Sequence, residues 1–345
     1  MKRLLLPIAV LVLSSVGESP VLTIRPSFRT AAVTGDADDP AIWVNPKDSA
    51  RSLIIGTDKK DGALYVFDLD GKKVQVVKGL DQPNNVDVEY GFNLGKRSVD
   101  IAVVTERKQR RLRIFAIDPI KRSLSDISGA TAVFAGEEGE LGAPMGIAMY
   151  KRKDGATFAF VSRKEGPTSG YVWQYRLTAA AGRIGLVKVR EVGFAEPGAE
   201  IESLAVDDRF GYVYLAEEKF GVRKYAADPD SPVAAKELGT FATGTFGGDR
   251  EGIAVVELGT KGYVICTEQM DGNSRYHVYP RDNQNGEPIA ILEGGADATD
   301  GIDASSSKLG KFGNGVLVAM NSKDRNFLVY DLGPVLSRLA KSAKP

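Results

Sequence analysis

The chain has 345 residues, with 45 Lys and Arg against 45 Asp and Glu, so its formal net charge at pH 7 is zero. Proteins that bind nucleic acid mainly by neutralising phosphates carry a basic surplus, so we expect no nucleic-acid partner. Apolar residues make up 43% of the chain. This composition supports a buried core and excludes a disordered protein.

The chain holds one cysteine, Cys266, and one histidine, His277. An internal disulfide and a cysteine-rich zinc site are therefore excluded. Both residues lie in strand-like stretches, where a structural role is the usual one. A bound metal is expected to have oxygen ligands, which are typical of calcium and magnesium.

Residues 1–18 (MKRLLLPIAVLVLSSVGE) have the pattern of a signal peptide: a basic start, an apolar run and then small residues. The apolar run from Leu4 to Leu13 is too short to cross a bilayer about 30 Å thick. We predict cleavage and secretion, to the periplasm or the extracellular medium, and no membrane partner. An uncleaved anchor or a buried N-terminal helix stays open as an alternative.

The body of the chain repeats one pattern six times: a β-rich run, a few polar residues and a second β-rich run. The copies begin at Ser52, Val99, Thr157, Gly211, Gly262 and Gly315, so successive starts are 47, 58, 54, 51 and 53 residues apart. Their Val, Ile, Tyr and Phe content and their polar turns indicate antiparallel hairpins. Another strand precedes each hairpin, and a fourth is expected between repeats.

Units of about 50 residues with four strands are typical of propeller blades, and six such blades close a ring. We predict an all-β fold: a six-bladed β-propeller with four-stranded antiparallel blades. A pair of β-sandwiches does not explain six copies of one strand order, and a solenoid needs shorter repeats.

The ends of the chain have roles in this prediction. Residues 20–33, with the alternating VLTIRP, are expected to supply the outer strand of the last blade and so close the ring. We predict one propeller domain over residues 19–340, a tail over 341–345, and a monomer. The stretch VLSRLAKSAK at 335–344 is either a short helix or a frayed end.

Acidic and amide residues recur where the first strand of a blade begins. They are Asp38 and Asp39, Asn84, Asn85 and Asp87, Glu200 and Glu202, Asp249 and Glu251, and Asp300 and Asp303. First strands line the channel of a propeller, so these side chains are expected to converge at one end of it. Unpaired carboxylates repel one another, and calcium with its six to eight oxygen ligands would neutralise them. The alternative is that they cap turns.

Basic residues recur in the loop after the second strand of the first four blades. They are Lys59 and Lys60, Arg107 and Lys108, Arg163 and Lys164, and Lys219, whereas the last two blades have Gln269 and Lys323. Cations beside a calcium-filled acidic floor suit a multiply charged anion such as a phosphate ester.

On these residues the chain resembles the β-propeller phytases, calcium-dependent 3-phytases that act on myo-inositol hexakisphosphate (phytate). The resemblance rests on DADDPAIW at residues 36–43, NNVD at 84–87, the pair Lys59 and Lys60, YLAEE at 214–218 and DGID at 300–303. It implies a six-bladed propeller, several calcium ions, and two neighbouring phosphate subsites, one for cleavage and one for affinity.

The resemblance also implies roles for individual residues. The calcium ligands of the cleavage centre, and hence the catalytic set, are expected to be Asp38, Glu202, Glu218, Asp249, Glu251 and Asp300. A more structural calcium site is expected at Asp39, Asn85 and Asp87. Phosphate-binding residues are expected to be Lys59, Lys60, Arg107 and Lys164, although Arg163 leaves the register of the last open. Met145 stands where the family usually has a tyrosine that contacts phosphate.

The expected reaction is direct, in-line attack on phosphorus by a calcium-activated water, with phytate binding as its calcium complex. Two alternatives stay open. A propeller lactonase or esterase would need His277 as its base. A calcium-binding propeller without catalysis would keep the acidic residues and not need the basic loops.

Overall fold

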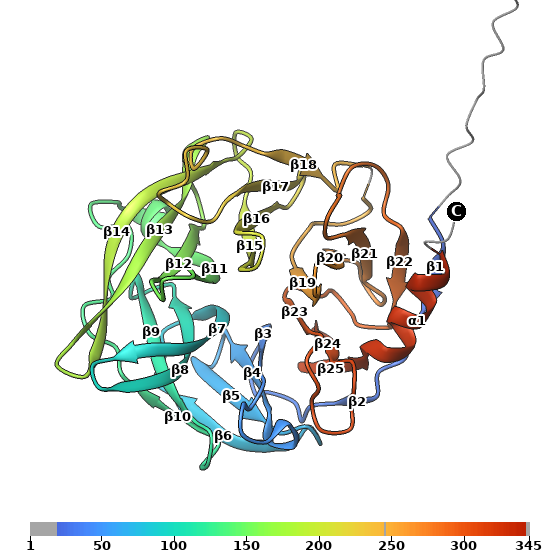
Figure 1. Ribbon diagram of the computed structural model, residues 1–345, viewed down its shortest axis with the longest axis horizontal. Coiled ribbons are helices and arrows are strands. Elements are labelled where there is room, and N and C mark those ends of the chain that lie inside the picture. Colours follow the sequence, from blue (N-terminus) through green and yellow to red (C-terminus); the bar gives the residue numbers. More distant parts are fainter. Residues whose placement is uncertain (1–18, 245, 343–345) are drawn as a thin grey trace, which may run out of the picture.

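The computed structural model describes residues 19–244 and 246–342, which form six β-sheets arranged around a central channel (Figure 1). Five sheets have four strands and one has five, and all pairings but one are antiparallel. The predicted six-bladed propeller with four-stranded antiparallel blades is confirmed. The predicted signal peptide and residues 343–345 of the predicted tail lie outside the described residues.

The strands follow one another through the blades in chain order. Blade 1 has β3 (Ala37–Trp43), β4 (Leu53–Asp58), β5 (Ala63–Phe67) and β6 (Lys73–Lys78). Blade 2 has β7 (Pro83–Leu94), β8 (Arg97–Glu106), β9 (Arg111–Asp118) and β10 (Ser123–Asp126). Blade 3 has β11 (Pro144–Lys151), β12 (Thr157–Arg163), β13 (Ser169–Ala180) and β14 (Arg183–Phe194).

The second half of the ring continues the same order. Blade 4 has β15 (Ile201–Asp207), β16 (Tyr212–Glu217), β17 (Gly221–Ala226) and β18 (Gly239–Phe241). Blade 5 has β19 (Ile253–Leu258), β20 (Lys261–Glu268), β21 (Arg275–Pro280) and β22 (Ala290–Glu293). Blade 6 has β23 (Ile302–Ser305), β24 (Val316–Asn321) and β25 (Asn326–Asp331). Two single helical turns, Ser49–Arg51 and Gly139–Gly142, lie in loops.

The core is divided among the contacts between neighbouring blades. Among the described residues there are six apolar clusters, one at each such contact. Successive residues of a strand point to opposite faces, so β4 serves two clusters: Leu53 and Ile55 face blade 2, and Ile54 faces blade 6. A strand buried on both faces reads as a continuous apolar run, as LII does here.

The N-terminal segment closes the ring in two blades. β2 (Phe28–Arg29) pairs antiparallel with β25 as the outer strand of blade 6, which confirms the predicted closure. The preceding β1 (Val21–Thr23) pairs parallel with β22 and becomes a fifth strand of blade 5. The alternating VLTIRP stretch therefore adds a strand to blade 5 and not to blade 6. Alternation alone does not indicate which blade a strand joins.

The C-terminal segment forms a helix, α1 (Leu332–Ser342), against blades 5 and 6 (Figure 1). Leu332, Val335 and Leu339 are buried in the cluster between these blades, and their spacing of three and four residues is that of one helix face. Of the two readings that the sequence left open, the helix is correct. Within the described residues, the structure has no helix that could span a membrane.

Replacing Leu339 by alanine is expected to lower the free energy of unfolding by about 2–4 kcal/mol, because Leu339 is 1% exposed and its removal leaves a cavity. Denaturant unfolding followed by circular dichroism measures this change. Lys341→Ala, at an exposed position of the same helix, is the control and should change stability by less than about 0.5 kcal/mol. Equal stability of the two variants would show that packing of α1 does not stabilise the propeller.

Candidate metal and phosphate site

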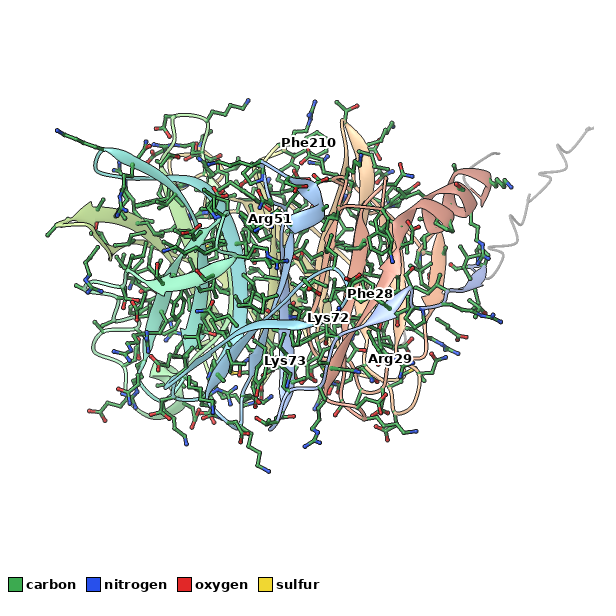
Figure 2. The ribbon with its side chains drawn as sticks, turned by 90° about the horizontal axis from the view of Figure 1, so that it is seen from below. Phe28, Arg29, Arg51, Lys72, Lys73 and Phe210 are labelled. Atoms are coloured by element: carbon green, nitrogen blue, oxygen red, sulfur yellow. The ribbon has the colours of Figure 1, made fainter. Side chains whose placement is uncertain are left out.

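The predicted acidic residues lie at one mouth of the channel. Phe210 and Arg51, in turns that join first and second strands, lie in the upper half of the side view, so the inner strands begin at the lower face (Figure 2). Seven carboxylates, which we call the entrance cluster, lie at this mouth: Asp38, Glu200, Glu202, Glu218, Asp249, Glu251 and Asp300.

Five members of the entrance cluster form two groups that share one residue. Carboxylate oxygens of Glu200, Glu202 and Glu218 lie within 4.8 Å of one another, and so do those of Glu218, Asp249 and Glu251. Two negative charges at this distance repel by roughly 3.5 kcal/mol at an effective dielectric constant of about 20. Such an arrangement needs either protons or a cation.

Lys59 links the remaining two members. Its Nζ lies 3.0 Å from Oδ2 of Asp38 and 3.9 Å from Oδ2 of Asp300. Asp38 is 1% exposed, and neither of its carboxylate oxygens accepts a well-oriented hydrogen bond within the described part of the chain. A buried carboxylate whose oxygens face only the Lys59 ammonium can accept a calcium ion.

Burial and mutual repulsion raise the pKa values of these acids. Burial, followed by the nearby Glu202 and Glu218, raises the pKa of Glu251 to about 10. Burial and the neighbouring Glu200 raise the pKa of Glu218 to about 8. Burial raises the pKa of Asp38 to about 6 even though Lys59 opposes the shift. Without a cation the cluster therefore retains protons, and its all-oxygen donor set fits calcium.

Two amide side chains orient members of the cluster. Asn84 Nδ2 donates to Oε1 of Glu202 at 3.0 Å, and Gln269 Nε2 donates to Oδ1 of Asp300 at 2.6 Å. The sequence analysis named Asn84 at the channel mouth and Gln269 in the loop series but selected neither as a site residue, and it left Glu200 out of the selected ligands. The signals were present: Asn84 begins the NNVD motif, and Gln269 occupies the loop position that is Lys59 in blade 1.

The basic residues divide between the site and the fold. Lys164 forms an ion pair with Glu200 beside the entrance cluster, whereas Arg163 is 1% exposed and donates to the carbonyls of Tyr171 and Gly170. The register that the sequence left open thus puts Lys164 at the mouth. A similar choice separates Glu218 from Glu217, which is fully buried in an ion pair with Arg223.

Arg107 and Lys60 have fewer partners. Arg107 contacts the sulfur of Met145, which is 1% exposed, and its Nε is buried without an acceptor among the described residues. Lys60 is exposed and forms no ion pair with the described carboxylates. Both retain donors for an anion, and the side chain at 145 contacts Arg107 and does not present a hydroxyl.

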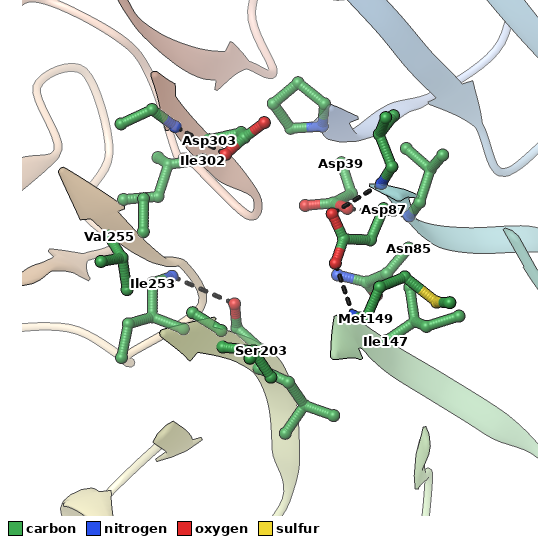
Figure 3. A pocket seen from close by; sticks show the side chains of 18 of the residues that line it. Asp39, Asn85, Asp87, Ile147, Met149, Ser203, Ile253, Val255, Ile302 and Asp303 are labelled. Atoms are coloured by element: carbon green, nitrogen blue, oxygen red, sulfur yellow. Dashed lines mark hydrogen bonds between the residues drawn. The ribbon is translucent and has the colours of Figure 1, made fainter. Parts of the chain in front are cut away.

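Asp39, Asn85 and Asp87 lie deeper, along a channel cavity of about 220 Å³ (Figure 3). Asp39 accepts from the backbone N–H of Val86, and Asp87 accepts from that of Met149, at 2.9 and 2.7 Å. Neither belongs to a group of three acidic, His or Cys ligand atoms within 4.8 Å among the described residues. The structural calcium site predicted for these three stays a prediction.

Backbone capping of this kind recurs around the channel. Asp303 of blade 6 accepts from Ile42 of blade 1 at 2.7 Å, and Ser203 of blade 4 accepts from Ile253 of blade 5 at 3.1 Å. In four of the six blades a side-chain oxygen of the inner strand thus accepts an N–H group of the next blade. These bonds set the spacing of the inner strands at the depth just below the entrance cluster.

His277 and Cys266 are not members of the entrance cluster. His277 is 7% exposed, bonds to Glu268 through Nε2 at 2.9 Å, and stacks on Phe246. Cys266 is fully buried in the cluster between blades 4 and 5. The lactonase alternative, which needed His277 as a base, has no support in this arrangement.

Glycine allows neighbouring inner strands to approach at the site. A Cβ added at Gly146 would lie 2.0 Å from the carbonyl oxygen of Glu202. Real Cβ atoms do not come so close to an oxygen, so a side chain there must displace the backbone that carries Glu202.

Gly146→Ala is therefore expected to cost about 1–3 kcal/mol of stability and to weaken calcium binding, because the strand bearing Glu202 must move. Calorimetric titration with calcium and thermal unfolding measure the two effects. Gly239→Ala, which meets no atom within 4 Å, is the matched control and should bind calcium as the parent protein does. Unchanged binding in Gly146→Ala would contradict the close approach.

The raised pKa values predict how pH changes the stabilisation by calcium. Unfolded carboxylates ionise near pH 4, whereas in the calcium-free fold Asp38, Glu218 and Glu251 keep protons up to about pH 6, 8 and 10. The folded state binds more protons between these limits, so calcium-free stability falls as pH rises. The increase in Tm on adding saturating calcium should grow from about pH 5 to about pH 9. An increase in Tm that is independent of pH would contradict these shifts.

Comparison with known proteins agrees with the fold and identifies the family. A model of the phytase family matches residues 2–328. A 3-phytase of Bacillus subtilis is 31% identical over 299 residues, which cover 84% of this chain and 75% of the relative.

Two solved structures share the fold at 12% sequence identity. A luciferin-regenerating enzyme superposes with a TM-score of 0.52 over 87% of this chain and 91% of its own. Regucalcin, a calcium-binding protein from Agrobacterium tumefaciens, superposes with a TM-score of 0.53 over 91% of this chain and 97% of its own. At this identity the likeness concerns the fold alone. The family model and the Bacillus relative also identify the family, and by both measures this chain belongs to the phytase family.

Proposed function

We propose that the protein is a calcium-dependent phosphomonoester hydrolase that removes phosphate from phytate, as a 3-phytase. The observation that carries this proposal is the entrance cluster, where seven carboxylates meet Lys59 and Lys164 at one mouth of the channel. Family membership and the printed activity of the Bacillus relative support it. The substrate would bind as its calcium complex.

The carboxylates would hold the metal. We assign this role to Asp38, Glu202, Glu218, Asp249, Glu251 and Asp300, and we add Glu200, which shares a group with two of them. Bound calcium supplies a Lewis acid that activates water and neutralises charge on the phosphoryl group. Asn84 and Gln269 keep Glu202 and Asp300 oriented through their amide hydrogen bonds, so that the ligands do not have to reorganise.

The basic residues would bind the phosphates. Lys59, held between Asp38 and Asp300, stands beside the metal ligands and can donate to an oxygen of the phosphoryl group being transferred. Lys164 approaches from the opposite side through Glu200. Arg107 and Lys60 retain donors for a neighbouring phosphate. Cations around an acidic floor suit a substrate that carries many phosphates and its own calcium.

Other parts of the proposal concern the rest of the chain. We propose that Asp39, Asn85 and Asp87 form a second, structural calcium site in the channel. We also propose that residues 19–340 act as one unit, that the protein works as a monomer, and that it is exported after cleavage of residues 1–18.

The proposal is tested by measuring phosphate release from phytate with added calcium and with excess chelator. Release should require calcium. Asp249→Asn and Lys59→Met should each lower kcat/KM by about 100-fold or more, because one removes a metal ligand and the other a cation at the phosphoryl group.

Matched controls come from an exposed ion pair elsewhere in blade 5. Lys261→Met and Asp282→Asn remove the two partners of that pair and should leave the activity unchanged. Absence of phosphate release at every calcium concentration, with calcium still raising the Tm, would overturn the proposal in favour of a calcium-binding propeller without catalysis.

A further inference from the structure

Arg250 is a buried cation between two members of the entrance cluster. It is 3% exposed and follows Asp249 and precedes Glu251 in the segment that leads into β19. In extended chain, alternate residues point to opposite sides. The carboxylates on either side face the channel mouth, and the guanidinium lies between blades 4 and 5.

All three nitrogens of the guanidinium donate to backbone carbonyls. Nε donates to Ala242 at 2.8 Å, Nη1 to Glu218 at 2.9 Å and Nη2 to Gly244 at 2.9 Å. The backbone N–H of Arg250 also donates to the Glu218 carbonyl, at 3.1 Å. One residue thus connects the turn that carries Glu218 with the loop that leads to Asp249.

The position of this charge differs from that of the other buried arginines. Arg163, Arg223 and Arg281 each have a carboxylate within 4.0 Å, and Arg250 has none among the described residues. Its guanidinium instead stacks on the ring of Phe246, 4.0 Å from the centroid. A buried cation without a paired acid is costly for the fold alone. Hydrogen bonds to three backbone carbonyls satisfy its donors in place of an acid.

We propose that Arg250 is a positioning residue for the entrance cluster: it holds the backbone of Glu218 and Asp249 so that their carboxylates meet at one cation. The inference rests on the proposed function of this site, and it assigns to Arg250 no contact with substrate. The shared group of Glu218, Asp249 and Glu251 is drawn from two blades, and Arg250, in the segment that leads into blade 5, bonds to the carbonyl of Glu218 in blade 4.

Other bonds locate the same segment. The carbonyl of Asp249 accepts from the backbone N–H of Gln269 at 2.8 Å, and the N–H of Glu218 donates to Glu200 at 3.1 Å. These two bonds hold the carbonyl of Asp249 and the N–H of Glu218. Arg250 holds the remaining group, the carbonyl of Glu218. Partners that orient metal ligands in this way typically contribute 10–100-fold to metal affinity.

The test compares Arg250→Met with Arg190→Met in the full mature chain. Arg190 is a matched control because it also donates to backbone carbonyls, those of Ala226, Ala227 and Ala234, and lies over the Phe160 ring without a carboxylate partner among the described residues. Calcium affinity is measured by calorimetric titration after chelator treatment, and Asp249→Asn identifies the binding event that belongs to the entrance cluster. Thermal unfolding in chelator reports the structural cost of each variant.

Arg250→Met is expected to weaken calcium binding at the entrance cluster by about 10-fold or more, whereas Arg190→Met leaves it within about 2-fold. Both should lower the calcium-free Tm. Arg250→Lys keeps the charge but reaches fewer carbonyls, so its loss of affinity should be smaller, about 3-fold. If Arg250→Met does not fold, Arg250→Lys is compared with Arg190→Lys in the same way.

Equal calcium affinity in the Arg250 and Arg190 variants would overturn the inference, and so would a parent protein that binds no calcium. Phosphate release by the parent protein is measured separately. A parent whose calcium affinity depends on Arg250 but which releases no phosphate from phytate would refute the proposed function and leave the positioning role intact.

Discussion

Repulsion among crowded, partly buried carboxylates is the constraint on which the rest of this structure depends. Seven acids meet at one mouth of the channel, and two lysines cannot neutralise them. Desolvation and like charge raise the pKa of Glu251 to about 10, because this place disfavours a bare negative charge. Such a site needs a rigid backbone and a cation that neutralises the carboxylates. The closed ring of blades provides the rigid backbone, and calcium is suited to neutralise the charge.

The rigidity comes from contacts between blades and not from any one blade. Hydrogen bonds join neighbouring inner strands along the channel wall. In each, a side-chain oxygen accepts an N–H of the following inner strand; the acceptors are Asp39, Asp87, Ser203 and Asp303. Gly146 lets the inner strands of blades 3 and 4 approach each other beside Glu202. The ligands of one cation can therefore come from several blades and still share a common frame.

The fold and most of the site could be predicted from the sequence, because repeats and alternation are local signals. Adjacent residues were harder: the choice of Lys164 over Arg163 and of Glu218 over Glu217 depends on which face of a strand each occupies, and a one-residue shift reverses the faces. The amide of Gln269 was missed because it acts on a carboxylate from another blade, a distant pairing that composition does not encode.

Closure of the ring brings the first and last blades together and places residues of both at the entrance cluster. Phe28 pairs with Val329, about 300 residues later, and Lys59 of blade 1 contacts Asp300 beside blade 6. Contacts between such distant residues form only after a large entropic cost of loop closure is met. A nascent chain that lacks its last blade also lacks one wall of the entrance cluster. The entrance cluster as a whole is therefore complete only once blade 6 has closed against blade 1, whereas its two groups of three carboxylates are supplied by blades 4 and 5 alone.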